Sequence, residues 1–196
     1  AYLDGKWKTG YDILVDNDRI LDIKPEGTYK DGQIIDVQGA YITPGFIDVH
    51  IHGSNGSDVM DDDKSSLENI SNFLASHGTT SWLATTMTVS RDAIRRSLKT
   101  VADYMKEDHK GAQILGVHLE GPFISPLAKG AHAEEHIKLP SIENFEAIAS
   151  GIPDIIRLVT MAPEQEGALE LIQYLKDRNI TPSLGHTRAS YQQCID

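Results

Sequence analysis

Cysteine is almost absent from this sequence, which has one, Cys194, in 196 residues. A single cysteine excludes a disulfide within the chain, and such low usage is typical of a reducing compartment. No run of about 18 consecutive apolar residues occurs, so we expect no membrane-spanning helix. Residues 1–15 also lack the apolar core of a signal peptide. These absences predict a soluble, cytoplasmic protein that does not bind a membrane.

Basic residues are scarce as well. Eighteen Lys and Arg residues stand against 29 Asp and Glu residues, for a formal net charge of -11. Because nucleic-acid phosphates require a basic surface, we expect no nucleic-acid partner. The balance still permits a small anionic substrate that is held by a few local cations. No Gly-x-Gly-x-x-Gly or Walker loop occurs after the first long apolar strand, which argues against a nucleotide site.

Short strands and turns are predicted for residues 1–44. The Asp4-Gly5 pair is typical of a tight hairpin turn. Further strands are expected at 11–15, 19–23 and 33–37. This segment has too little apolar surface to fold alone. We therefore predict that residues 1–44 form the first part of a small β domain, completed by other chain or packed against the residues after position 44.

From residue 45 onward the pattern changes to strand, loop and helix, repeated. The predicted strands are 46–52, 79–86, 114–120, 155–161 and 181–186. Ser65, Ser90 and Ser141 are the predicted N-caps of three helices. A fourth helix is expected from Glu164, with Leu169 on its buried side.

This alternation predicts parallel βαβ units, arranged as a doubly wound open sheet or as a (β/α) barrel. The informative polar residues, His52, Glu120 and His186, stand at the carboxyl ends of predicted strands. In a barrel those ends surround one central site. We therefore predict that residues 45–196 form the first five β/α units of a TIM-type (β/α)8 barrel.

Two histidines on the first long strand are the clearest chemical signal. His50 and His52 are two residues apart, so both imidazoles point to the same side of a strand. Ile47, Val49 and Ile51 form the opposite, apolar face. Converging imidazoles suit a divalent cation of borderline hardness. A polar strand facing solvent is the alternative interpretation.

Glu120 and His186 extend this signal to two other strands. A carboxylate on the inward face of a strand is costly unless it is paired or binds a metal. Taken alone, Glu120 also fits a salt bridge at the barrel rim, and His186 a solvated rim histidine. Together with His50 and His52 they supply the ligand types of a catalytic zinc-like site.

Two further histidines lie near these positions. His118 faces the same side as Glu120, where it is either a hydrogen-bonded core residue or a group that orients a ligand. His132 lies on the loop beyond Glu120, in Lys129-Gly130-Ala131-His132. It is therefore expected to touch a substrate rather than the metal.

Several segments resemble the amidohydrolase superfamily. They are Pro44-Gly45-Phe46-Ile47-Asp48-Val49-His50-Ile51-His52-Gly53, Val117-His118-Leu119-Glu120-Gly121-Pro122-Phe123, Lys129-Gly130-Ala131-His132 and Leu184-Gly185-His186-Thr187. The resemblance spans essentially the whole chain and is strongest to members that deacetylate phosphorylated N-acetyl amino sugars. It implies a metallo (β/α)8 barrel, a small β-sandwich built from both chain ends, and a homodimer.

The resemblance also implies a ligand set and a substrate. Glu120 and His186 would bind the main metal, and His50 and His52 a second metal in members that retain both. Zn²⁺ or Fe²⁺ is the expected cation, with one or two per site. Ala131 and His132 match the loop that contacts the amino sugar, which is expected to be N-acetylglucosamine 6-phosphate.

Parts of the family pattern are expected beyond Asp196. They include a third histidine ligand on the sixth barrel strand and the catalytic aspartate on the eighth, so no catalytic residue is assigned within the chain. We expect the chain to be an N-terminal fragment that is inactive alone. Two alternatives remain: another amidohydrolase, such as a deaminase or dihydroorotase, and a non-catalytic barrel. Dihydroorotase-type sites use a modified lysine on the fourth strand, which 155–161 lacks.

Overall fold

The computed structural model describes residues 1–152 and 154–195. The chain divides into two compact units, Ala1–Gly45 and Phe46–Asp196. No helix among the described residues is long and apolar enough to cross a membrane.

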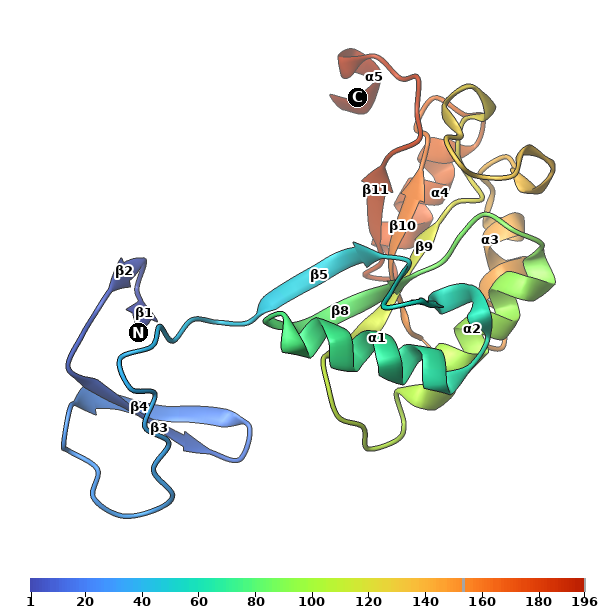
Figure 1. Cartoon of the computed structure of the whole chain (residues 1–196). Coiled ribbons are helices and arrows are strands. Elements are labelled where there is room, and N and C mark those ends of the chain that lie inside the picture. The colour runs from blue at the N-terminus through green and yellow to red at the C-terminus, as the bar shows by residue number, and fades with distance from the viewer. Residues whose placement is uncertain (153, 196) are drawn as a thin grey trace. The chain divides into compact units, whose positions relative to one another are not determined.

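Five parallel strands form the sheet of the larger unit (Figure 1). They are β5 (Phe46–Ile51), β8 (Thr79–Thr85), β9 (Gln113–Glu120), β10 (Ile156–Met161) and β11 (Thr181–Leu184). Their order in the sheet is β11-β10-β9-β8-β5, and every neighbouring pair is parallel. Because this order follows the chain without reversing, the doubly wound alternative is excluded. The curled sheet is part of a (β/α) barrel, as predicted.

Helices connect the successive strands. They are α1 (Lys64–Ser76), α2 (Arg91–Tyr104), α3 (Ile142–Ala149) and α4 (Ala168–Lys176), with a short α5 (Tyr191–Ile195) after β11. Short elements fill the loops at β6 (Gly53–Ser54), β7 (Ser57–Asp58), η1 (Val59–Asp61), η2 (Pro126–Ala128) and η3 (Glu134–His136). Ser90 and Ser141 cap α2 and α3 as predicted. The predicted cap of α1 is wrong, since Asp63 precedes that helix and accepts the backbone N–H of Ser65.

An apolar stripe on each of the helices α1 to α4 joins the buried core, whereas α5 has no buried residue. On α2, Ile94, Leu98 and Val101 are essentially fully buried, which matches the i, i+4, i+7 spacing of one helix face. Burying one such side chain stabilises the fold by roughly 1.5–3 kcal/mol. The prediction for Leu169 is wrong, because it is 65% exposed while Leu171 is buried. Helix α4 begins at Ala168 rather than near Glu164, so its inward stripe is shifted.

The edge strand β5 is more exposed than the strands inside the sheet. Its apolar side was predicted from Ile47, Val49 and Ile51, but Ile47 is 61% and Val49 50% exposed. A strand at a sheet edge has one hydrogen-bonded neighbour, here β8. Ile47 and Val49 are thus not buried by the described residues, whereas Ile51 packs against the hydrophobic core.

The smaller unit contains two antiparallel pairs. Strands β1 (Tyr2–Leu3) and β2 (Lys6–Trp7) form one, and β3 (Tyr11–Asp16) and β4 (Arg19–Pro25) the other. Asp4 and Gly5 both have positive φ, 50° and 73°, as a type I′ hairpin turn requires.

One strand predicted in the smaller unit is wrong. Residues 33–37 form no strand, and Ile34 and Ile35 are 74% and 81% exposed. An apolar alternation becomes a strand only when a partner supplies hydrogen bonds, and these residues have none from another strand here. Membership of residues 1–44 in a β-sandwich stays a prediction.

Candidate metal centre

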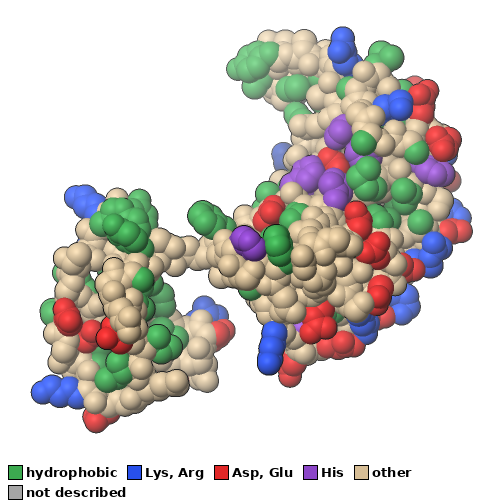
Figure 2. Space-filling model, viewed as in Figure 1, with side chains coloured by type: hydrophobic (Ala, Val, Ile, Leu, Met, Phe, Trp, Pro, Cys, Tyr) green, Lys and Arg blue, Asp and Glu red, His purple; other side chains and the backbone are tan. Residues whose placement is uncertain are grey.

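The carboxyl ends of the parallel strands carry the chemically informative side chains. His50 lies on β5 and His52 comes directly after it, while Glu120 is the last residue of β9. His186 was predicted to end its strand, but it stands two residues beyond β11, with a φ of 50°. Figure 2 shows several histidine side chains gathered around an acidic one on the larger unit.

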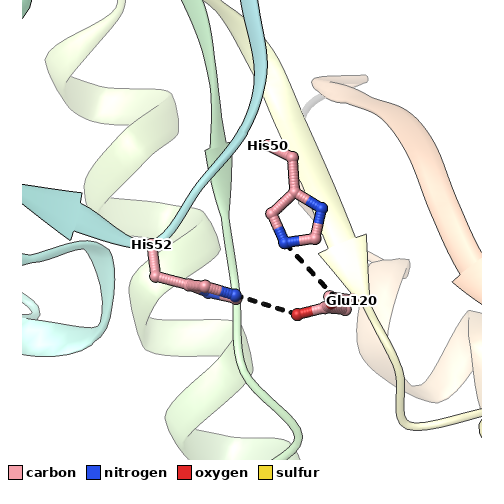
Figure 3. A group of neighbouring side chains, drawn as sticks. All are labelled: His50, His52 and Glu120. Atoms are coloured by element: carbon pink, nitrogen blue, oxygen red, sulfur yellow. Dashed lines mark ion pairs between the residues drawn. The ribbon is translucent and has the colours of Figure 1, made fainter. Parts of the chain in front are cut away.

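Glu120 is the centre of this group, and its side chain is 5% exposed. Its Oε2 lies 2.9 Å from Nε2 of His52, and its Oε1 lies 3.4 Å from Nε2 of His50 (Figure 3). The Nε2 atoms of His186 and His132 approach the same carboxylate at 3.1 and 3.4 Å. The structure therefore brings all four predicted ligands together, although their binding of a metal stays a prediction.

Backbone carbonyls orient two of these imidazoles. Nδ1 of His52 lies 3.2 Å from the carbonyl oxygen of Thr85, and Nδ1 of His186 lies 3.0 Å from that of Ala128. A carbonyl only accepts, so in each ring Nδ1 carries the proton. In the neutral ring the lone pair is then on Nε2 and can bind a cation, whereas in the protonated ring Nε2–H donates to Glu120 instead. The neutral form is the one that a metal-binding histidine requires.

The charges of the group are coupled. Burial alone would raise the pKa of Glu120, but the hydrogen bond from His52 and the charges of His50, His52 and His132 outweigh it and lower the pKa to about 2. The hydrogen bond to Glu120 raises the pKa of His52 against the effect of burial. Glu120 is thus ionised at any ordinary pH, and its carboxylate places a negative charge in the middle of the group of histidines.

His118 has a different role. Its Nδ1 lies 3.0 Å from the carbonyl oxygen of Val49, and its Nε2 lies 2.7 Å from Oγ1 of Thr160. Burial, with a contribution from the charge of His50, lowers its pKa to about 4. Both ring nitrogens are satisfied, so His118 is a hydrogen-bonded core residue.

The loop after β9 places the two predicted substrate contacts differently. Ala131 is exposed, whereas His132 is 3% exposed and its Nδ1 lies 3.1 Å from the backbone nitrogen of Thr88. Contact of either residue with a substrate stays a prediction. The sequence predicted that His132 touches a substrate rather than the metal, and it gave no sign that Nε2 of His132 lies 3.4 Å from the Glu120 carboxylate.

Glu164 is a residue that the sequence did not indicate. Its carboxylate accepts the backbone N–H of Arg188 at 2.7 Å and the hydroxyl of Thr187. The backbone N–H of Ser125 donates to the carbonyl of His186 at 2.9 Å. These bonds hold the segment that carries His186 in its left-handed conformation. The sequence around Glu164 does not indicate this role, because the residues that it contacts lie in a loop much later in the chain.

Residues 41–186 match the model of the amidohydrolase family. The chain is 42% identical over 151 residues to N-acetylglucosamine-6-phosphate deacetylase of Bacillus subtilis (strain 168), covering 76% of this chain and 38% of that protein. It is 40% identical over 152 residues to N-acetylgalactosamine-6-phosphate deacetylase of Escherichia coli O157:H7, covering 78% and 40%.

Solved structures agree with these relatives. The crystal structure of N-acetylglucosamine-6-phosphate deacetylase from Pasteurella multocida superposes with a TM-score of 0.86 at 32% identity, covering 95% of this chain and 48% of that one. The chain thus spans two fifths to about half the length of the proteins it matches. The family match extends over His50, His52, Glu120 and His186, and the chain belongs to the amidohydrolase family.

Proposed function

We propose that the intact protein removes the acetyl group of N-acetylglucosamine 6-phosphate by hydrolysis, giving glucosamine 6-phosphate and acetate. The observation that carries the proposal is the buried carboxylate of Glu120, faced by four imidazole Nε2 atoms at 2.9–3.4 Å. One carboxylate and several imidazoles at strand carboxyl ends are the donors of a catalytic site in a barrel hydrolase.

The donor set fits a divalent cation. Glu120 and His186 would hold the main metal, Zn²⁺ or Fe²⁺, and His50 and His52 a second one. The Nδ1–H bonds of His52 and His186 to carbonyl oxygens support this assignment, since they leave Nε2 free to bind. When bound, a divalent cation polarises an amide carbonyl and acidifies water.

The remaining residues would bind and orient the sugar. Ala131 and His132 lie on the loop directly after Glu120, so a sugar held by them would have its acetamide group beside the carboxylate. The group that moves the proton is proposed to be an aspartate outside residues 1–196. Homodimerisation and a cytoplasmic location are further proposals, the second supported by the single cysteine.

Two substrates should be compared, the N-acetylglucosamine and the N-acetylgalactosamine 6-phosphates, because relatives of similar identity are named for each. The Bacillus subtilis relative is named for N-acetylglucosamine 6-phosphate and the Escherichia coli relative for N-acetylgalactosamine 6-phosphate. A mutant of the Mycobacterium smegmatis enzyme, 27% identical over 92% of this chain with a TM-score of 0.83, was solved with N-acetyl-D-glucosamine-6-phosphate. We therefore place the gluco sugar first.

The test is acetate release by the intact protein. Each sugar is supplied with and without its phosphate, to protein that is metal-replete, stripped by a chelator, or restored with Zn²⁺ or Fe²⁺. We expect release from the phosphorylated gluco sugar, its loss on stripping and its return with metal. The replacement His186→Asn should abolish both metal retention and turnover. Absence of acetate from both phosphorylated sugars with metal restored would refute the proposal.

A further inference from the structure

Thr88 links two parts of the metal centre from the loop after β8. It is 1% exposed. Its backbone N–H donates to Nδ1 of His132 at 3.1 Å, and its hydroxyl donates to the carbonyl oxygen of Glu120 at 3.4 Å. A backbone nitrogen always donates, so Nδ1 of His132 has to accept. A neutral His132 ring then carries its proton on Nε2.

This arrangement is opposite to that of the neighbouring histidines. His52 and His186 have a carbonyl oxygen at Nδ1, which leaves the lone pair of the neutral ring on Nε2, where it can bind a cation. His132 has a donor at Nδ1, which makes Nε2 the donor. Its Nε2 lies 3.4 Å from Oε2 of Glu120, an oxygen that can accept this proton. Distance alone would group His132 with Glu120 and His186 as metal ligands, but the direction of the Thr88 bond argues against it.

Packing fixes the position of Thr88. A Cβ atom added to Gly121 would lie 2.1 Å from Oγ1 of Thr88, and Gly121 has a φ of 72°. The threonine side chain therefore occupies the space above the glycine that comes after Glu120. Because Thr88 is confined on this side and bonded to Glu120, the direction of its N–H is also confined.

We infer that Thr88 is a positioning residue whose backbone N–H fixes His132 as a hydrogen-bond donor through Nε2 and so keeps His132 out of the metal ligand set. In the proposed deacetylase an oxygen of the bound sugar would accept this hydrogen bond in place of Oε2 of Glu120. That consequence rests on the proposed function, whereas the protonation pattern of the ring does not.

The ring protons can be observed directly in the intact, Zn²⁺-loaded protein. Two-bond ¹H–¹⁵N correlations of ¹⁵N-labelled histidines report which ring nitrogen is protonated. We expect His132 to be protonated at Nε2, and His52 and His186 to be protonated at Nδ1 with Nε2 on zinc. A spectrum in which His132 is protonated at Nδ1, or has Nε2 on zinc, would overturn the inference.

A backbone ester then tests the role of Thr88. Replacing Thr88 by its α-hydroxy acid analogue turns the N–H into an ester oxygen and keeps the side chain. In this ester, His132 should no longer be protonated at Nε2 alone, while the zinc content of the protein stays unchanged. The matched control is the same replacement at Thr86, whose N–H donates to the carbonyl of His118 at 3.0 Å. An unchanged His132 spectrum in the Thr88 ester would contradict the inference.

Two amide variants separate the ring nitrogens by function. The amide nitrogen of His132→Gln can reach the position of Nε2, whereas that of His132→Asn can reach only the position of Nδ1. Both variants should keep their metal, and kcat/KM should be higher for Gln by roughly tenfold, as for one hydrogen bond. Loss of a metal ion in His132→Gln would contradict the inference.

If neither phosphorylated sugar is hydrolysed, the proposed function fails, and the spectra still decide the role of Thr88.

Discussion

Oε1 of Glu120 lies 3.1 Å from Nε2 of His186, although 66 residues separate them. Glu120 ends β9 and His186 comes after β11, and these strands are not neighbours because β10 lies between them. In the same way β8 lies between β5, which carries His50, and β9. Side chains from alternate strands meet in one layer at the mouth of a barrel. The centre therefore depends on the curl of the sheet.

The replacement His52→Asn should lower metal content. It removes the ring nitrogen Nε2 that lies beside Glu120 and is proposed to bind the metal. Loss of a residue that only orients a metal ligand typically costs roughly tenfold or more in metal affinity, so losing a ligand should lower the affinity by at least roughly tenfold. Metal analysis after dialysis against a graded chelator series measures it. His77→Asn is the control, because the ring of His77 contacts Phe73 and Ser76 at the end of α1 and is not part of the group around Glu120. Equal metal content in all three proteins would contradict the ligand assignment.

Acid should destabilise the metal-free protein partly through Glu120. Its pKa is about 2 in the folded chain against an ordinary 4.5, so its ionised form stabilises the fold above pH 4.5. That contribution is lost as the pH falls from 4.5 towards 2. Between pH 5 and pH 2 the unfolding free energy of wild type should fall relative to Glu120→Gln, by at most about 3 kcal/mol. Urea titrations at each pH test it. A difference independent of pH would show that the pKa is not lowered.

Gly121→Ala should be strongly destabilising. The added Cβ would lie 2.1 Å from Oγ1 of Thr88, and the φ of 72° is unfavourable for alanine as well. Gly56→Ala is a matched control, because its φ is 80° and nothing lies within 4 Å of the new atom. We expect a loss of about 1–2 kcal/mol for Gly56→Ala from the backbone alone, and a larger loss for Gly121→Ala. Equal losses in denaturant titrations would mean that the loop at Thr88 can move aside.

Leucine truncation should separate the buried and exposed helix faces. Leu98 on α2 is fully buried and Leu169 on α4 is 65% exposed. Leu98→Ala is expected to cost about 2–5 kcal/mol of unfolding free energy, because it removes buried atoms and leaves a cavity. Leu169→Ala should change it by less than about 0.5 kcal/mol. If Leu169→Ala costs as much in the intact protein, that face of α4 is covered there.

Local sequence determined the order and type of the elements in the larger unit. Alternating apolar strands and capped helices identified five β/α units, because strand and helix periods are set by the backbone itself. The parity of β5 placed His50 and His52 on one side. The cap of α1 was misplaced by two residues, since Asp63 and Ser65 are both good caps and only the chain's path into the helix decides between them.

Only the tertiary structure decided which atoms of the site face one another. The carbonyls of Thr85 and Ala128 and the N–H of Thr88 set the proton positions of three histidines, and every residue type offers such backbone groups. A sequence therefore contains no sign of which carbonyl or N–H meets a ring. The strand wrongly predicted at 33–37 and the wrongly predicted burial of Ile47 have the same physical cause. Propensity is a local property, whereas a hydrogen-bonded partner or a covering helix is supplied by residues distant in the chain.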